Sequence, residues 1–230
     1  MTISDTIYEE VCMMKKVTLT LIVIIAIATV SANAGMILST DFTGRTVNGA
    51  TAENITWTAN GVTNPGNLTA TSNLFTHPDT EGHFAVNSNV GNGAPWSTTF
   101  TINVTGSDIS LTDVDMDVTN FSGSGALQTV LRDVKWTITV DGSNSDPVSQ
   151  QVIGLAPAKT TISLNIEFDS PITLTGTENY AITILAEKAT YSGNNAGIDA
   201  ISFNGSVVPE PATIALLAFG GLGLLRRRRA

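Results

Sequence analysis

The sequence has very few of the residues that usually carry covalent or metal chemistry. Among its 230 residues there is one cysteine, Cys12, and there are two histidines. One cysteine cannot form an intramolecular disulfide or a thiolate metal cluster. No Gly-x-Ser-x-Gly sequence occurs, and neither histidine has an evident serine and aspartate partner nearby. A nucleophile activated by a neighbouring base is therefore not predicted.

Positive charge is also scarce, and most of it lies at the two ends of the chain. Between Gly35 and Val208 there are sixteen Asp and Glu residues against five Lys and Arg residues, a net charge of −11. Such an acidic balance argues against a nucleic-acid partner and against binding to anionic lipid. It is compatible with binding of cations or of neutral polysaccharide.

Long apolar runs are absent except near the two ends. The C-terminal run, Ala212 to Leu225, has fourteen residues and would rise roughly 21 Å as a helix, against an apolar bilayer core of about 30 Å. We expect a short membrane helix at 212–225. The cluster Arg226, Arg227, Arg228 and Arg229 sets its topology, because Lys and Arg stay on the cytoplasmic side. The rest of the chain then lies outside the cytoplasm.

The order of features in residues 207–230 resembles the PEP-CTERM sorting signal of Gram-negative bacteria. Pro209, Glu210 and Pro211 precede the apolar run, and the arginine cluster follows it. The resemblance implies that an exosortase recognises and processes the chain at this motif. It also implies a transient membrane-anchored intermediate and a final place at the cell surface or in the extracellular matrix.

The N-terminal apolar run has the features of a Sec signal peptide. Lys15 and Lys16 precede the apolar stretch 17–30, and Ala32 and Ala34 form the small-x-small pattern cleaved by signal peptidase. We expect cleavage after Ala34, and translation from Met13 or Met14, because the preceding residues are acidic. The predicted organisation is a leader at 1–34, an extracellular domain at 35–206 and a sorting signal at 207–230. The exported part then contains no cysteine.

The sequence of the central domain predicts an all-β fold. Apolar and polar residues alternate in period two, which is typical of antiparallel strands with one buried face. The clearest segments are 54–58, 99–104, 113–118, 134–140, 162–168 and 180–186. Turn sequences such as Asn60-Gly61 separate them,. We expect a jelly-roll-like antiparallel sandwich of two sheets, flanked by the signal helix and the membrane helix, with an immunoglobulin-like sandwich as the alternative.

The last segment of the domain is similar to the closing strand of many extracellular jelly-roll modules. Ile198, Asp199, Ala200 and Ile201 give the Ile-Asp-x-Ile pattern of that strand, and such modules often bind carbohydrate. Asp199 is expected to bind backbone N–H groups or a structural cation. Flat aromatic side chains serve as sugar platforms, and we expect Trp96, followed by Tyr191, to be exposed for such a role, because Trp57 and Trp136 alternate in phase with apolar neighbours.

Two clusters are candidate metal sites. Asp113, Asp115 and Asp117 lie on one face of a predicted strand, about 7 Å apart, where they could attract calcium. The alternative is a solvated acidic face, because a straight strand makes its side chains diverge. The segment 77–83 contains both histidines with two acids and could hold a transition metal, although loop polarity explains it equally well. No other cofactor is expected.

The enzymatic interpretation is weaker than the binding one. Glu167 and Asp169 match the first half of the Glu-x-Asp-x-x-Glu strand of jelly-roll glucanases, but the third acidic position is Ile172. Pro171 is expected to end the strand, so the pair of catalytic carboxylates is incomplete. The sequence therefore predicts a non-enzymatic exported surface protein. A carbohydrate-binding module for exopolysaccharide and a secreted glycoside hydrolase remain as alternatives.

Overall fold

The computed structural model describes residues 35–75, 83–88, 90, 93–121, 134–140, 148–152, 161–176, 178–188 and 195–208. These residues belong to one compact unit, Ala34–Val208. They form strands and connecting segments with no α-helix among them. The predicted all-β class is confirmed. The two predicted flanking helices lie outside the described residues.

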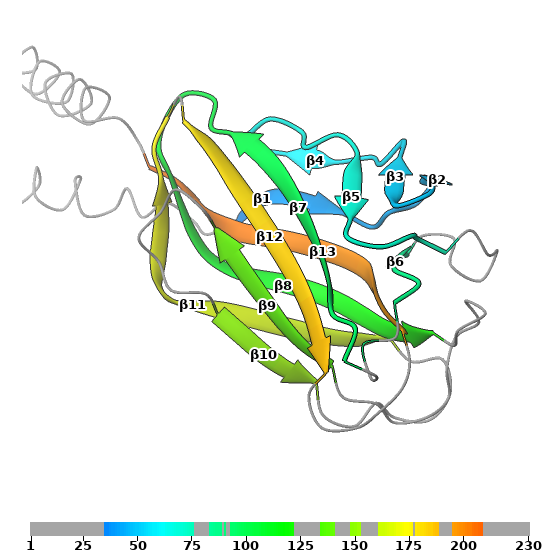
Figure 1. Cartoon of the computed structure of the whole chain (residues 1–230). Coiled ribbons are helices and arrows are strands. Elements are labelled where there is room, and N and C mark those ends of the chain that lie inside the picture. Colours follow the sequence, from blue (N-terminus) through cyan, green and yellow to red (C-terminus); the bar gives the residue numbers. More distant parts are fainter. Residues whose placement is uncertain are drawn as a thin grey trace, which may run out of the picture. The chain divides into compact units, whose positions relative to one another are not determined.

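The first sheet, sheet A, has the strand order β11-β8-β13-β1-β4, and β6 pairs with β13 beside this path. All its pairs are antiparallel. β13, the last strand, lies at its centre between β8 and β1 (Figure 1). The strands are β1 (Gly35–Thr40), β4 (Thr58–Ala59), β6 (Phe84–Ala85), β8 (Ile109–Phe121), β11 (Ile162–Leu174) and β13 (Asn195–Val207).

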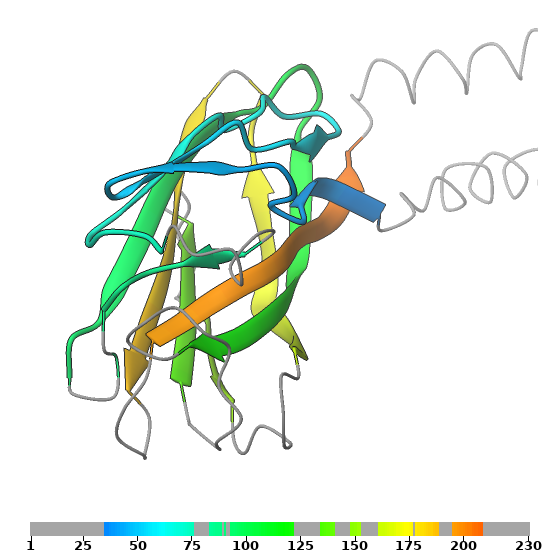
Figure 2. The same cartoon turned by 90° about the vertical axis from the view of Figure 1, so that its right-hand side faces the viewer.

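The second sheet, sheet B, is also antiparallel throughout and has the order β10-β9-β12-β7-β5-β3-β2. Figure 2 shows β7, β12 and β9 in one layer, with β13, β8 and β11 in the other. The strands are β2 (Thr46–Asn48), β3 (Thr51–Glu53), β5 (Leu68–Ala70), β7 (Trp96–Asn103), β9 (Val134–Val140), β10 (Val148–Val152) and β12 (Asn179–Lys188).

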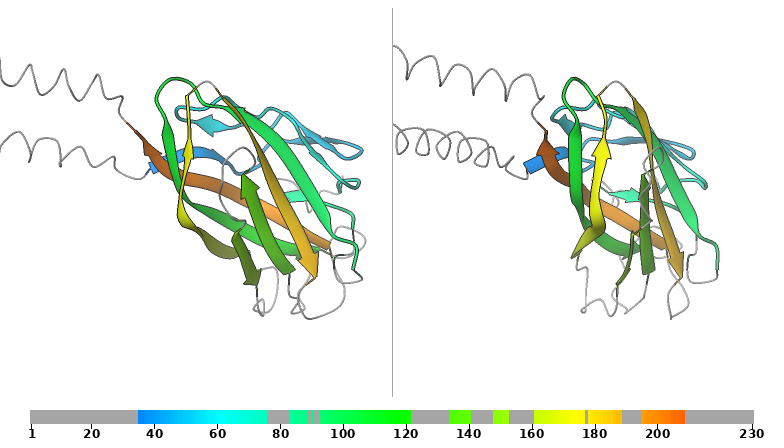
Figure 3. Two further views of the ribbon diagram at one scale, coloured as in Figure 1. Left: turned by 60° about the vertical axis from the view of Figure 1, so that its left-hand side comes forward. Right: turned by 90° about the vertical axis from the view of Figure 1, so that its left-hand side faces the viewer.

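The sheets pack face to face because each strand buries alternate side chains. In β9, Val134, Trp136, Ile138 and Val140 are buried, and the residues between them are partly exposed. Figure 3 shows the two layers from two further sides. One cluster of buried apolar side chains from both sheets fills the space between them. From β7 onward, consecutive strands alternate between the sheets, except for the β9–β10 hairpin. This connectivity makes the two-sheet sandwich one cooperative core.

Two local predictions were wrong. Residues 55–57 are not a strand; Ile55 and Trp57 lie in an irregular segment before β4, where Trp57 is still buried and donates its Nε1–H to the carbonyl of Gly66 at 3.0 Å. Pro171 does not end β11, which continues to Leu174. The register with β8 shifts between Glu167 and Ile172, and such a bulge tolerates proline because the ladder is interrupted there.

Gly205 has no room for a side chain, because β13 and β8 approach each other closely at its position. A Cβ atom there would lie 2.2 Å from the backbone oxygen of Ser110. We expect Gly205→Ala to lower the free energy of unfolding by about 3 kcal/mol, since backbone atoms cannot move aside as a flexible side chain does. Denaturant unfolding of the domain at residues 35–206 measures this.

Gly66→Ala is the control for this substitution. Gly66 has a φ of +75° but no heavy atom within 4 Å of a built Cβ, so we expect a loss of only about 1 kcal/mol from backbone strain. Equal losses of unfolding free energy in the two variants would show that the close approach of the strands at Gly205 adds no cost to the substitution.

Candidate functional site

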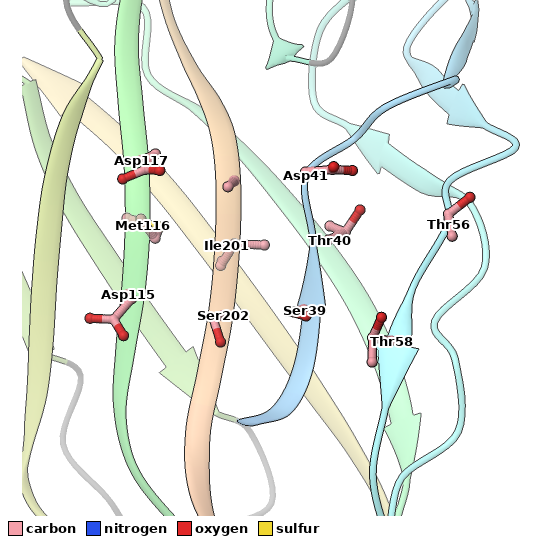
Figure 4. A pocket seen from close by; sticks show the side chains of 11 residues that line it. Ser39, Thr40, Asp41, Thr56, Thr58, Asp115, Met116, Asp117, Ile201 and Ser202 are labelled. Atoms are coloured by element: carbon pink, nitrogen blue, oxygen red, sulfur yellow. The ribbon is translucent and has the colours of Figure 1, made fainter. Parts of the chain in front are cut away.

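An open groove lined mainly by polar residues lies on the outer face of sheet A in the described part of the chain. Its volume is about 490 Å³. Figure 4 shows Asp115 and Asp117 on β8 at one side of the groove and Thr56 and Thr58 at the other. Its lining consists of Ser39, Thr40, Asp41, Thr56, Thr58, Asp115, Met116, Asp117, Ala200, Ile201 and Ser202. We call this feature the sheet A groove.

Strand register explains why short polar side chains meet there. Asn165 on β11 is opposite Asp115 on β8, which is opposite Ser202 on β13. Ser202 is opposite Ser39 on β1, and Ser39 is opposite Thr58 on β4. Because directly opposite residues of a sheet share one face, this register places a polar row across the sheet. The row runs outside the sandwich, while Met116 and Ile201 beside it are buried.

Two amide side chains hold the central carboxylates of β8 in place. Asn204 donates from Nδ2 to Asp113 Oδ1 at 2.8 Å and to Asp115 Oδ2 at 2.7 Å. Asn165 donates from Nδ2 to Asp115 Oδ1 at 2.8 Å and to Asp113 Oδ1 at 3.2 Å. Amide groups on both flanking strands therefore bridge the two carboxylates and order this part of the face.

Among the described residues, the other acidic groups of the groove have fewer hydrogen-bond partners. Ser163 donates its hydroxyl to Asp117 Oδ1 at 2.5 Å. The backbone N–H of Thr43 donates to Asp41 Oδ1 at 3.0 Å. These donors are neutral, and the described residues that line the groove include no lysine or arginine. The groove is thus acidic and rich in hydroxyl groups.

The predicted calcium ligands Asp113, Asp115 and Asp117 do share the outer face of β8. Within the described ranges, no three His, Cys, Asp or Glu side chains are placed so that they could hold one metal ion. The carboxylates point outward along a strand and bind amides and hydroxyls. Calcium at this position stays a prediction, and the contacts favour the solvated acidic face.

Asp199 lies beside His83 rather than among the other carboxylates. Its Oδ1 is 2.9 Å from His83 Nδ1, but the pair is not aligned as a hydrogen bond. Arg45 donates its Nε–H to the backbone oxygen of His83. Burial lowers the pKa of His83, Asp199 raises it and Arg45 lowers it; burial also lowers the pKa of Arg45. Of the predicted metal-binding segment 77–83, only His83 is described.

The expectation that Trp96 is exposed was wrong. Trp96 is the first residue of β7 and only 1% exposed, because it points inward in phase with Phe100 and Ile102. Its ring lies 5.8 Å from that of Phe84 and 5.6 Å from that of Trp136. A side chain so enclosed cannot serve as a sugar platform. Tyr191, the other predicted platform, lies outside the described residues.

The outer face of sheet B is also polar, but its hydroxyl groups bond to one another. Register aligns Thr51, Thr69, Thr99 and Thr183 on neighbouring strands. The Oγ1 atoms are 3.2 Å apart for Thr51 and Thr69 and 2.8 Å apart for Thr99 and Thr183. Among the described residues, sheet A therefore offers the better binding surface, since it has both a recess and carboxylates.

Sequence reasoning named Asp115 and Asp117 but missed Asp41, Ser39, Thr58 and Ser202. Asp41 and Thr58 lie in short or irregular segments, Ser39 and Ser202 lie on β1 and β13, and in each case the only local signal was a single polar residue. The strand order brings these residues together, because it makes neighbours of strands that are far apart in the sequence.

The predicted sorting residues Pro209, Glu210 and Pro211, the arginine cluster 226–229 and the signal-cleavage residues Ala32 and Ala34 lie outside the described residues. Within the described part, no helix is both long and apolar enough to span a membrane.

Comparison with solved structures finds matches at low identity and low TM-score. The Cry4Aa mosquito-larvicidal toxin of Bacillus thuringiensis matches with a TM-score of 0.35 and 11% identity, over 64% of this chain and 24% of the toxin. TmCBM61, solved with beta-1,4-galactotriose, matches with a TM-score of 0.33 and 11% identity, over 70% of this chain and 88% of its own. An isomalto-dextranase of Arthrobacter globiformis T6, solved with panose, matches with a TM-score of 0.35 and 16% identity, over 75% of this chain and 33% of its own. The chain thus spans about a quarter of the toxin and a third of the dextranase.

No curated protein matches the chain. A family model does match its C-terminal end: residues 207–229 fit the PEP-CTERM protein-sorting motif. This match contains Pro209, Glu210, Pro211 and the four arginines, as the order of features in the sequence predicted. The motif is the recognition signal of exosortases and indicates export across a membrane. The chain therefore joins an all-β sandwich to a PEP-CTERM protein-sorting motif at residues 207–229.

Proposed function

We propose that this is a non-enzymatic binding protein of the cell surface or extracellular matrix, and that its sandwich binds extracellular polysaccharide in the sheet A groove. The observation that carries the proposal is the groove itself. It is an open recess of about 490 Å³ lined by hydroxyl and carboxylate groups from strands of sheet A and the segments beside β1 and β4. A polymer of sugars presents the matching groups, because each hydroxyl can both donate and accept hydrogen bonds.

The chemistry of the groove suits recognition of hydroxyl groups. Asp117 and Asp41 each have a carboxylate oxygen beyond the one that accepts the hydrogen bond described above. Carboxylates accept stronger hydrogen bonds than neutral groups do. Ser39, Thr58 and Ser202 add hydroxyls that can adapt to either role. The openness of the groove would let a chain pass through it, so that repeated weak contacts could add up along a polymer.

The sorting motif supports the proposed location. The C-terminal helix would first anchor the protein in the cytoplasmic membrane. Processing by an exosortase would then release it on the outer side of that membrane. Signal peptidase acting after Ala34 would free the other end. The cell surface or matrix as final destination is part of the proposal, and a polysaccharide-binding domain is useful in that location.

A glycoside hydrolase is the less favoured alternative. Glu167 is exposed on β11, but Ile172, which stands at the position of the second glutamate in the glucanase pattern, is 2% exposed and belongs to the core. A retaining glycosidase needs a second carboxylate about 5 Å from the first, on the substrate side. The apolar residue at that position therefore favours binding over hydrolysis.

Filling the groove tests the proposal. We expect Thr58→Trp to weaken binding to the polysaccharide isolated from cultures of the producing cells by about tenfold or more, because the indole would occupy the recess. Thr58 is exposed, so the fold should tolerate the change. Retention on the immobilised polysaccharide, measured by affinity electrophoresis or surface plasmon resonance, gives the affinity.

Thr101→Trp is the matched control, because Thr101 is an exposed residue of β7 on the outer face of sheet B. It adds the same side chain outside the groove and should leave binding unchanged. If both variants bind as well as the natural protein, the groove is not the binding site, and absence of any binding would remove polysaccharide recognition as the function.

A further inference from the structure

The carboxylates of the sheet A groove are spread along it rather than gathered at one point. Asp115 and Asp117 are two residues apart on β8, about 7 Å along the strand, and Asp41 enters the lining from the end of β1. No three such groups in the described ranges converge as a metal site would require. The carboxylates are therefore spaced along the groove and do not converge on one position where a single ion could bind.

The cationic side chains whose contacts are described lie elsewhere. Lys135 is 3.6 Å from Glu187, a pair on β9 and β12 of sheet B. Arg45 contacts the backbone of His83. None of the described residues that line the groove is basic, and the hydrogen bonds described for its carboxylates come from neutral amide, hydroxyl and backbone groups. The groove thus presents negative charge to its ligand.

We propose that the ligand of the sheet A groove is a polymeric glycan with free amino groups, whose spaced positive charges meet the spaced carboxylates. This inference rests on the proposed function and specifies the ligand class. Hydroxyl groups of the sugars would bind Ser39, Thr58 and Ser202, and protonated amines would bind Asp41 and Asp117. A glycan rich in uronic acids would be repelled, because like charges would face each other in the groove.

Chitosan and chitin beads are the probes, since they share one sugar backbone and differ in whether the amino group is free or acetylated. We expect the full-length protein, solubilised in detergent, to bind chitosan at least tenfold more tightly than chitin. Added salt should weaken the chitosan interaction and reduce this ratio, because the charges are exposed to solvent. Binding to polygalacturonate should be weaker than binding to either bead.

Two substitutions remove charge without removing the hydrogen-bond acceptor. Asp117→Asn keeps an oxygen for the Ser163 hydroxyl, and Asp41→Asn keeps one for the Thr43 N–H. We expect each to weaken binding to chitosan by about threefold, and the double variant by about tenfold, because each exposed ion pair contributes only a small free energy of binding. Binding to chitin should change much less.

Asp169→Asn is the control for non-specific attraction between an acidic protein and a cationic bead. Asp169 is exposed on β11 and does not line the groove. An equal loss of chitosan binding in Asp169→Asn and Asp117→Asn would overturn the inference, as would equal affinity for chitosan and chitin.

The outcomes also separate this inference from the proposed function. Binding of neutral polysaccharide that Thr58→Trp abolishes, and that the asparagine variants leave intact, would retain the groove as a binding site and refute the cationic ligand. Failure of the protein to bind any of these polymers would refute both.

Discussion

Replacing Glu210 with alanine is expected to leave the protein uncleaved in the cytoplasmic membrane. Glu210 lies within the matched sorting motif, between two prolines. Proline on both sides disfavours helix and keeps the segment extended, so an exosortase could reach its backbone and bind the single carboxylate. Insertion should be intact or improved, because a charge is removed from the membrane edge. Cell fractionation and the intact mass of the tagged protein measure the result.

Loss of the arginine cluster is expected to cause a different sorting defect. Serine at positions 226–229 removes the charges that oppose translocation of a short apolar run, so the full-length chain should be released from the membrane. A host without an exosortase is the control for both variants. Normal processing of the Glu210→Ala protein, or identical processing in the two hosts, would mean that the tail acts only as a weak anchor.

Trp96→Ala is expected to be among the most destabilising substitutions in the domain. The side chain is 1% exposed and packs against Phe84 of sheet A and Trp136 of sheet B. Truncation would leave a cavity between the sheets and lower the free energy of unfolding by about 4 kcal/mol. Chemical denaturation of the exported domain, followed by tryptophan fluorescence or far-ultraviolet circular dichroism, would show this.

The Trp96→Phe variant tests whether Trp96 contributes to core packing or to sugar binding. A phenyl ring keeps most of the aromatic contacts, so its loss of stability should be less than half that of the alanine variant. Both variants, where folded, should bind polysaccharide as the natural protein does. A specific loss of binding in a stable Trp96→Phe protein would contradict the core assignment.

The strands were largely predictable because local alternation determines which side of a strand is buried. The segment 134–140 alternates without interruption and is a strand with those limits. Ile55 and Trp57 show the limit of the method: their spacing also suits an irregular segment in which Trp57 reaches the core. Pro171 shows another limit, because the bulge that accommodates it depends on the register with β8.

Trp96 was misplaced because the local sequence gives two conflicting signals. Gly93, Ala94 and Pro95 indicate a loop, and an aromatic residue after a loop suggests exposure. The residue is in fact the first inward position of β7. Its neighbours Phe84 and Trp136 come from other strands, so only the assembled sandwich shows that it is enclosed.

The candidate site was less predictable than the strands for the same reason. The acidic residues of β8 could be identified from their spacing on one strand. Their neighbours could not, because Asn204 is 91 residues from Asp113 in sequence and yet donates to it at 2.8 Å. Register and strand order, which period-two alternation does not determine, create both the amide bridges and the groove.

The central position of β13 has a consequence for the timing of folding. β13 pairs with both β8 and β1, and Gly35 at the beginning of the domain lies opposite Gly205 near its end. Sheet A therefore cannot close until residues 195–207 are available, and contacts between such distant segments form slowly. The emerging chain would remain unfolded until nearly all of it had crossed the membrane, which is the state that a threading export channel requires. A chain that stalls before β13 would leave the edges of β1 and β8 unpaired and prone to aggregation.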